Sequence, residues 1–186
     1  MARIVATEFM SLDGVIEDPG GSEDFKHGGW SFEISSGDDG MQFKVDETMR
    51  SEAMLLGRRT YEGFAEAWPE RDGDFADKFN SLPKYVVSST LRDPSWGDTT
   101  VLDGDLPAAI ARVNEEREGE VVVHGSAQLV QGLIAGDLLD ELRLMVFPVV
   151  LGAGKRLFGA TDDTKPLRLS GSRVVGDGVA ILTYER

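Results

Sequence analysis

The sequence predicts a three-layer α/β domain with a mainly parallel sheet that ends in an antiparallel hairpin. Short apolar runs alternate with longer segments of helical periodicity, an order that favours crossover helices and parallel strands. The last two apolar runs are instead joined by Gly176-Asp177-Gly178, a strong hairpin signal. At 186 residues the chain has the length of one well-buried core, so we expect a single domain over residues 1–186.

The first half of the chain predicts strands that alternate with helices. Residues 3–9 form the first strand, and a stretch rich in Gly, Asp and Ser follows to residue 40. Asp38 and Asp39 then cap a helix on which apolar residues recur every fourth position, at Met41, Val45 and Met49. Three further elements follow: a strand at 53–56, a helix that begins near Thr60, and a strand at 84–88.

The second half continues the alternation up to the hairpin. A short strand at 99–101 precedes an amphipathic helix around 106–113, with Pro107 in its first turn. A strand at 121–123 is followed by a helix around 129–134, which Gly136 ends. A long strand at 141–150 and the hairpin strands 167–175 and 179–184 complete the domain.

Composition excludes several classes of function. The chain has 33 acidic and 19 basic residues, and a net charge of −14 repels nucleic acid and anionic membranes. It contains no cysteine, which excludes disulfides, thiol nucleophiles and cysteine-ligated zinc. No apolar run is long enough to span a bilayer, and residues 1–6 lack the apolar core of a signal peptide. We therefore expect a cytoplasmic protein with no nucleic-acid or membrane partner.

Two segments have the order of residues that binds phosphate. In residues 53–62 an apolar strand is followed by Gly57, Arg58, Arg59 and Thr60 at a helix start. Helix N-termini present unpaired N–H groups and a partial positive charge, and guanidinium groups bind phosphate oxygens in pairs. Residues 120–129 repeat the order of strand, glycine, hydroxyl residue and helix. If the two turns converge, they hold a nucleotide cofactor by more than one phosphate.

Other familiar site patterns are missing from the sequence. The glycines of residues 152–159 have the wrong spacing for a dinucleotide fingerprint and the wrong order for a P-loop. No Gly-x-Ser-x-Gly occurs. With His27 and His124 as the only histidines, a histidine-dependent triad or a multi-histidine metal centre is not expected.

Four residues outside these turns, or at their border, have two interpretations each. His124 ends a buried strand, where it either faces a ligand or satisfies a local backbone group, and we favour the structural role. Ser88 and Ser89 either start a turn or, beside the arginines, bind the 2′-phosphate of NADPH. Trp30 lies in the long irregular stretch from residue 17 to 40, which we expect to be a lid over the ligand; its ring either covers the ligand or anchors the loop to the core.

At this point the chain resembles the dihydrofolate reductase superfamily, most closely its branch that is similar to the reductase domain of riboflavin biosynthesis. The resemblance covers nearly the whole chain and rests on the order and spacing of five segments. These are residues 11–16 (SLDGVI), 56–61 (LGRRTY), 87–89 (VSS), 123–127 (VHGSA) and 148–158 (PVVLGAGKRLF).

The resemblance implies an NADPH-dependent reductase, commonly a homodimer. It implies that the adenosine-side phosphates are bound by Gly57, Arg58, Arg59 and Thr60, with Ser88 and Ser89. It also implies that the turn formed by His124, Gly125, Ser126 and Ala127 binds the pyrophosphate. The resemblance further implies that the main chain of Glu8 and the side chain of Ile16 contact the nicotinamide. Asp13 is then the first residue of the mobile loop that covers it.

The resemblance also bears on the substrate. In true dihydrofolate reductases the proton-handling acid lies on the first helix, at a position that is Met41 here, so folate is a doubtful substrate. The segment 151–154 instead implies the riboflavin-type branch, which reduces a ribosylaminopyrimidine phosphate. We expect Asp39 and Asp13 among the catalytic residues, and Asp38, Trp30, Gly154 and Lys155 at the substrate. Lys155 and Arg156 either meet the substrate phosphate or are a surface charge pair.

The expected chemistry is hydride transfer to a polarised C=N or C=O carbon, with a proton from water or from an acid such as Asp39. Two alternatives stay open. One is a reductase of dihydrofolate or another pterin, and the other is a non-catalytic NADPH-binding protein of the same fold.

Overall fold

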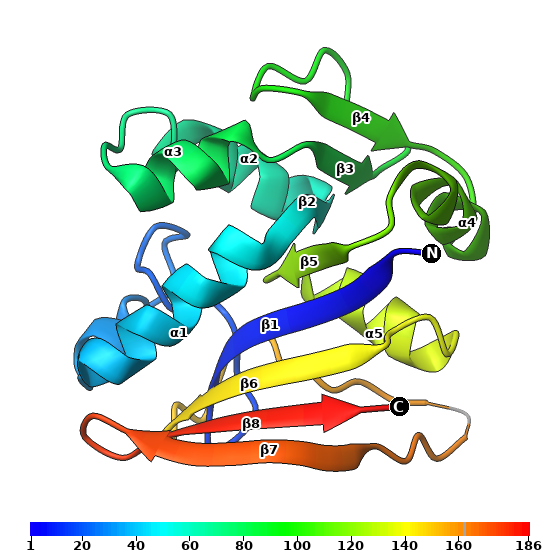
Figure 1. Cartoon of the computed structure of the whole chain (residues 1–186). Helices are drawn as coiled ribbons and strands as arrows, with labels where there is room; N and C mark the ends of the chain where they lie inside the picture. Colours follow the sequence, from blue (N-terminus) through cyan, green and yellow to red (C-terminus); the bar gives the residue numbers. More distant parts are fainter. Residues whose placement is uncertain (162) are drawn as a thin grey trace.

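A computed structural model describes residues 1–161 and 163–186. Its sheet has eight strands in the order β4-β3-β2-β5-β1-β6-β8-β7 (Figure 1). All neighbouring pairs from β4 to β6 are parallel, and β8 is antiparallel to both β6 and β7. The strands are β1 (Arg3–Ser11), β2 (Ser51–Gly57), β3 (Lys84–Val87), β4 (Thr99–Leu102), β5 (Glu120–His124), β6 (Glu141–Phe147), β7 (Arg168–Val175) and β8 (Val179–Glu185).

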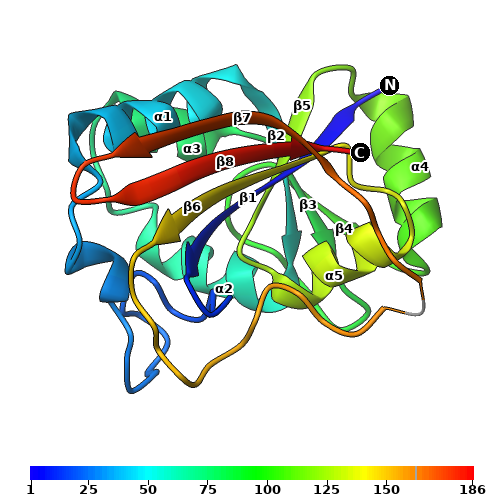
Figure 2. The same ribbon diagram turned by 90° about the horizontal axis from the view of Figure 1, so that it is seen from below.

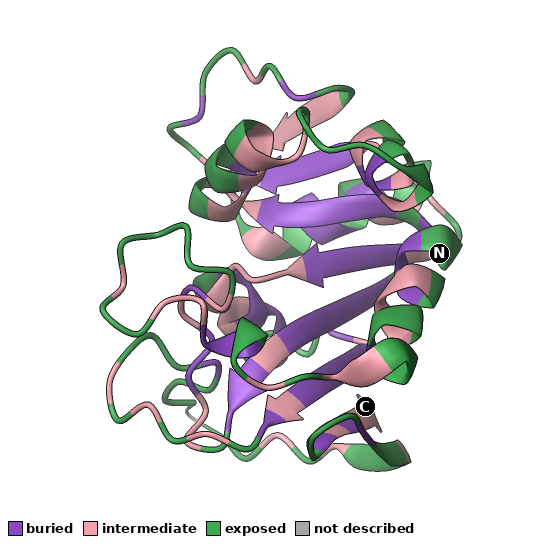
Figure 3. Cartoon of the chain, turned by 90° about the vertical axis from the view of Figure 1, so that its left-hand side faces the viewer, coloured by how far each residue is buried: buried purple, intermediate pink, exposed green. Residues whose placement is uncertain are grey.

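Helices cover both faces of this sheet. The helices α1 (Gly37–Arg50), α2 (Arg58–Ala67) and α3 (Asp74–Ser81) lie on one face, and α4 (Leu106–Glu116) and α5 (Ala127–Ala135) on the other. Apolar residues of α4 and α5 pack with alternate residues of β1 such as Ile4 and Ala6. Aromatic residues of α2 and α3 pack instead on Met54 and Leu56 of β2. The central strands are buried, whereas the outer helix surfaces are exposed (Figure 3).

The observed architecture confirms the predicted fold class, including the antiparallel hairpin that Figure 2 shows beside β6. Several element boundaries differ from the sequence prediction, and two differences are instructive. The strand β6 ends at Phe147 rather than Val150, because Pro148 has no N–H to continue the ladder. The helix α3 is not among the predicted elements; it begins after Gly73, which has a positive φ of 102°. Within the described residues, no helix is long and apolar enough to cross a membrane.

The helix α1 lies where the sequence predicts it, but its apolar stripe faces outward. Met41 and Met49 are 63% and 43% exposed. The residues that α1 buries are Gly40, Glu47 and Thr48, and Lys44 lies next to them on the same side. The fourfold spacing therefore identifies the helix correctly but not the face that packs on the sheet, since the buried face is polar.

That polar face belongs to a buried ionic cluster on the sheet. Arg143 of β6, 5% exposed, donates to Glu120 at 2.8 Å and to Glu47 at 3.4 Å, and also pairs with Glu141. Lys44 Nζ donates to Glu47 at 2.5 Å and to the Thr7 hydroxyl at 2.9 Å. Although burial opposes it, hydrogen bonding to Glu120 and the charges of the three carboxylates leave the pKa of Arg143 raised, so it carries its charge throughout the accessible pH range.

We expect Arg143→Ala to lower the free energy of unfolding by about 3–5 kcal/mol, because it removes the cation that three carboxylates share and leaves Glu47 with Lys44 alone and Glu141 with Arg3 alone. Urea denaturation followed by circular dichroism measures this. The matched control is Arg112→Ala, which removes an exposed pair with Glu116 at 3.2 Å and should change the free energy by about 0–1 kcal/mol. Equal effects of the two substitutions would contradict a stabilising role for the cluster.

Candidate functional site

Four polar segments meet at one edge of the sheet. Because β3, β2, β5 and β1 are parallel neighbours, their carboxyl ends lie side by side. The chain leaves β1 through α1 on one face and leaves β5 through α5 on the other, so the boundary between β1 and β5 is a topological switch point. Ligands of open α/β sheets bind at such a point. The candidate site therefore lies at this edge.

The two predicted phosphate-binding turns converge and are hydrogen-bonded to each other. The N–H of Gly57 donates to the Ser126 hydroxyl at 3.0 Å, and the N–H of Ser126 donates to the Thr60 hydroxyl at 3.1 Å. Gly125 and Ser126 both have a positive φ, of 54° and 57°. A side chain at Gly125 would stand 3.3 Å from the Thr60 hydroxyl, so glycine fits this close approach best. The first turns of α2 and α5 thus open onto the same edge.

The two arginines differ in their surroundings. Arg58 forms an exposed ion pair with Glu62 one helical turn later, at 2.8 Å. Arg59 is exposed and has no ion pair among the residues that the structure describes. Exposed i,i+4 pairs contribute little to stability, so Arg58 can exchange Glu62 for a phosphate at small cost, and Arg59 needs no exchange.

Ser88 and Ser89 follow β3 directly beside this turn, since Val87 pairs with Gly57. The Ser88 hydroxyl accepts the N–H groups of Leu91 at 2.9 Å and Thr90 at 3.1 Å, which closes a turn after the strand. Ser89 is exposed. The structure thus gives Ser88 a turn-forming role and places Ser89 on the surface.

His124 ends β5, but its ring packs away from the two turns. The ring lies 5.4 Å from Phe79 and 6.3 Å from Phe64, within the aromatic cluster of α2 and α3. Burial lowers the pKa of His124 well below its usual value, and the nearby charge of Lys44 lowers it further. The imidazole is therefore neutral at physiological pH and packs as an aromatic ring, and the backbone carbonyl of His124 accepts the Ser126 hydroxyl at 3.0 Å.

Asp13 joins two loops that flank the site. Its carboxylate accepts the Ser11 hydroxyl at 2.7 Å and the N–H groups of Leu151 and Gly152 at 3.1 and 2.9 Å. These hydrogen bonds hold the pKa of Asp13 well below its ordinary value. A carboxylate that is ionised and accepts three hydrogen bonds has no proton to donate. Asp13 therefore lacks the protonated carboxyl group that we expected of a catalytic acid.

The segment 152–156 packs against the residues that follow Asp13. A backbone bridge joins Val15 to Arg156, and the N–H of Ile16 donates to the carbonyl of Lys155 at 2.9 Å. The side chain of Ile16 is 7% exposed and belongs to the core. Gly154 has a φ of 118°, and a side chain there would lie 2.6 Å from Val15, so Gly154 permits a close backbone approach. Lys155 pairs with Glu17 at 2.9 Å, which supports the interpretation as a surface charge pair.

Trp30 anchors the long loop. It is 2% exposed, donates its ring N–H to the carbonyl of Glu17 at 2.8 Å and packs edge-to-face on Phe147 at 5.4 Å. Asp18, 3% exposed, organises the same loop by accepting the N–H of Ser22 at 2.6 Å. Of the two interpretations of Trp30, the structure matches the one in which the ring fixes the loop to the core, and little of the side chain is left to cover a ligand.

Asp38 and Asp39 are not brought to the two turns. Both are exposed in the first turn of α1. This helix start lies beside the β7–β8 turn, where the N–H of Asp177 donates to the carbonyl of Ser35 at 2.8 Å. The hairpin is at the far side of β6 from the β1–β5 boundary, so neither aspartate lies near the phosphate-binding turns.

The carboxyl group of Glu8 is the site feature that the sequence did not reveal. Glu8 is 4% exposed, and its Oε1 has no hydrogen-bond partner among the described residues. Burial raises the pKa of Glu8 well above its ordinary value; Lys44 and the backbone N–H of Gly125 lower it, and Glu47 raises it. The alternation of β1 was the available signal, because it places Glu8 on the same face as the buried Ile4 and Ala6.

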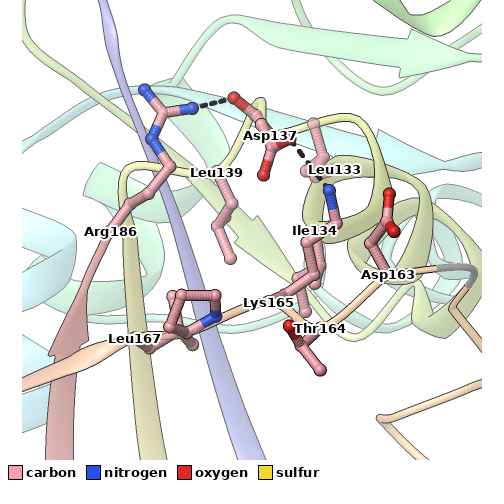
Figure 4. A pocket seen from close by; sticks show the side chains of 10 residues that line it. Leu133, Ile134, Asp137, Leu139, Asp163, Thr164, Lys165, Leu167 and Arg186 are labelled. Atoms are coloured by element: carbon pink, nitrogen blue, oxygen red, sulfur yellow. Dashed lines mark hydrogen bonds and ion pairs between the residues drawn. The ribbon is translucent and has the colours of Figure 1, made fainter.

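A cavity of about 330 Å³ lies elsewhere, between the end of α5 and the segment before β7 (Figure 4). Its cationic groups are already engaged, since Lys165 pairs with Asp137 at 2.8 Å and Arg186 donates to the carbonyl of the same residue. It includes none of the site residues named above. Among the described residues, no group of His, Cys, Asp and Glu side chains is arranged to hold a metal ion.

Comparisons with known proteins identify the family of this chain. A family model described as the RibD C-terminal domain matches residues 2–181. The Bacillus subtilis proteins YwjB and YyaP are 29% and 26% identical to this chain; the alignments cover 92% and 98% of it, and 91% and 94% of the relatives.

Solved structures share the fold. A putative riboflavin biosynthesis protein from Shewanella sp. PV-4 matches with a TM-score of 0.80 and 26% identity over 100% of this chain and 99% of the other. A pyrimidine reductase-like protein from Corynebacterium diphtheriae matches in fold, with a TM-score of 0.69 and 13% identity over 99% and 91% of the two chains. The eight-stranded fold and the family match agree, and the chain belongs to the RibD C-terminal domain family.

Proposed function

We propose that this protein is an NADPH-dependent reductase that transfers hydride to a pyrimidine- or pterin-type substrate, most like the ribosylaminopyrimidine reductase of riboflavin biosynthesis. The observation that carries the proposal is the pair of hydrogen bonds by which Ser126 joins the turns at Gly57 and Thr60. Two helix N-termini held together in this way suit a ligand with several phosphates. Family membership and the riboflavin-related structural neighbours support the reductase class.

The residues present fit a bound nicotinamide nucleotide. The first turns of α2 and α5 supply backbone N–H groups for the pyrophosphate, and Arg59 supplies a guanidinium group for a 2′-phosphate. Beyond the last β1–β5 pair, Thr7 with His124, the strand β1 continues with only β6 as its neighbour. The main chain from Glu8 onward is therefore placed for contact with a planar ring. When bound, the dihydronicotinamide would supply the hydride.

The direct test is NADPH titration, followed by NADPH consumption with a panel of ribosylaminopyrimidines and pterins. Turnover of a ribosylaminopyrimidine supports the proposal. Turnover of dihydrofolate alone would favour the pterin reductase alternative, and binding without consumption would favour the non-catalytic one.

We expect Arg59→Ala to weaken NADPH binding by about 10- to 100-fold, since one charge-assisted contact to phosphate is worth about 1.5–3 kcal/mol. NADH binding should change little, because NADH has no 2′-phosphate. Isothermal titration with both nucleotides measures the difference, and Glu66→Ala, elsewhere on α2, is the control. An equal loss for NADPH and NADH would contradict the assignment of Arg59 to the 2′-phosphate.

We also propose that the protein is a homodimer and that the exposed apolar residues of α1 contribute to the contact. A helix that turns Met41 and Met49 to solvent while it buries charged residues on its other side presents an apolar stripe to a partner. The resemblance to a commonly dimeric family makes a second copy the expected partner.

The double substitution of Met41→Glu and Met49→Glu should convert a dimer to a monomer, because it places four like charges in a two-fold contact. Size-exclusion chromatography with light scattering measures the mass. Val150→Glu, at an apolar residue that is 68% exposed outside α1, should leave the dimer intact. A monomeric parent protein, or a double variant that stays dimeric, would overturn this interface.

A further inference from the structure

We propose that the side chain of Glu8 is the acid that delivers the proton during the reduction. The inference deepens the proposed function and rests on it. It assigns to the carboxyl group of Glu8 a catalytic role that differs from a main-chain contact with the nicotinamide.

Glu8 stands at the switch point of the sheet. The strand β5 makes its last pair at Thr7 with His124, and Glu8 is the next residue of β1. On its other side Glu8 pairs with Leu144 of β6, so the backbone there is fixed. The backbone N–H of Gly125, which belongs to one of the two phosphate-binding turns, lies close enough to the carboxyl group to lower its pKa. Glu8 therefore lies beside that turn, at the point where β1 no longer has β5 as a neighbour.

The partners of the buried carboxyl groups set Glu8 apart. Glu47 and Glu141 are also buried, at 0% and 5% exposed, and both pair with Arg143. Glu8 is 4% exposed, yet its Oε1 has no partner in the described part of the chain. Buried polar atoms are rarely left unpaired without a functional reason. A substrate atom that accepts a hydrogen bond would satisfy this group.

Burial, more than the surrounding charges, favours the protonated carboxyl group of Glu8. Lys44 on α1 is the cation that acts on Glu8, but its ammonium group already donates to Glu47 and Thr7. Glu47 opposes ionisation of Glu8, and His124 of β5 is neutral. On β6, Arg143 is engaged by Glu47, Glu120 and Glu141. Burial therefore dominates, and it favours the neutral acid.

The proposed step balances in atoms and charge. Hydride from the dihydronicotinamide forms a C–H bond at the carbon of a C=N or C=O group, and the π electrons move to the nitrogen or oxygen. The O–H bond of Glu8 breaks as the new N–H or O–H bond forms. Glu8 is left as a carboxylate, which solvent protonates before the next turnover. The cofactor is oxidised and the substrate is reduced.

The two aspartates expected from the sequence are poorly placed for this role. Asp13 is ionised and holds the loop at Leu151 and Gly152. Asp39 is exposed at the start of α1, beside the β7–β8 turn. Of these three acids, Glu8 alone is buried at the β1–β5 boundary.

The first experiment is the kinetics of Glu8→Gln with NADPH and the best substrate of the panel. A positioned general acid contributes about 10²- to 10⁴-fold, so we expect kcat to fall by at least about 100-fold. The KM for NADPH should change by less than about threefold, since no phosphate contact is altered. In the parent protein kcat should fall as pH rises through the pKa of Glu8, and this fall should be absent in the variant.

The second experiment measures thermal stability as a function of pH, without cofactor. Below the ordinary glutamate pKa of 4.5 the carboxyl group is neutral in both the folded and the unfolded chain. As pH rises from there towards the higher pKa of the folded protein, only the unfolded chain releases the proton, and the fold loses stability. Glu8→Gln removes this loss, so its Tm should exceed that of the parent at pH 8 and approach it near pH 5.

The matched control is Glu141→Gln, a change at a carboxyl group of nearly equal burial that is paired with Arg3 and Arg143. It should lower the Tm at pH 8 and keep the pH dependence of kcat, as expected of a structural carboxylate.

Three results would overturn the inference. A Glu8→Gln variant that keeps kcat and its pH dependence removes the catalytic role. A loss of Tm at pH 8 in that variant shows that the carboxyl group is a structural carboxylate. A parent protein that binds no NADPH overturns the proposed function and this inference together, whereas the first two results leave NADPH binding intact and overturn the inference alone.

Discussion

The hydrogen bonds of Ser126 are the constraint on which the candidate site depends. This residue accepts the N–H of Gly57 and donates its own N–H to Thr60, so two turns that are distant in sequence hold each other at fixed distance. Its left-handed backbone, directly after a left-handed Gly125, brings the chain close enough to do so. Without these bonds the entrances of α2 and α5 would be two separate anion sites on the same edge. With them, they form one site suited to several linked phosphates.

The buried ionic cluster around Arg143 differs from Glu8 in how its carboxyl groups are paired. The face of α1 that packs on the sheet is polar, and Lys44 and Glu47 join Arg143 in a cluster in which each carboxylate has a cation. Desolvation offsets much of the attraction in such a cluster, but the loss of its shared cation is costly because the buried carboxylates then lack full compensation. Glu8 lies close by but has no comparable partner. Within the described residues, a buried acid whose Oε1 has no hydrogen-bond partner at a strand end costs stability, and our proposal gives this acid a catalytic use.

The loops beside the site are held firmly. Asp13 binds the segment after β6, Asp18 binds the loop before α1, and Trp30 inserts that loop into the core. Each is a residue type to which sequence reasoning readily assigns chemistry, yet each does its observed work as a hydrogen-bond acceptor or packing group. The long loop is thus organised by Asp18 and anchored to the core by Trp30.

The sequence by itself determined the fold class, the order of the strands and of the helices other than α3, the C-terminal hairpin and the position of the two turns that converge, because these follow from local periodicity and turn chemistry. Only the tertiary structure decided which face of α1 is buried. The fourfold spacing of Met41, Val45 and Met49 indicates a helix, but it does not show whether that face packs on the sheet or faces solvent. It also decided the burial and the hydrogen-bond partners of the acidic side chains, and so the direction in which their pKa values shift. Hydrogen bonds from the Ser11 hydroxyl and from the N–H groups of Leu151 and Gly152 lower the pKa of Asp13, whereas burial in the sheet raises the pKa of Glu8. Burial and partners come from residues far apart in the chain, so no local pattern could show them.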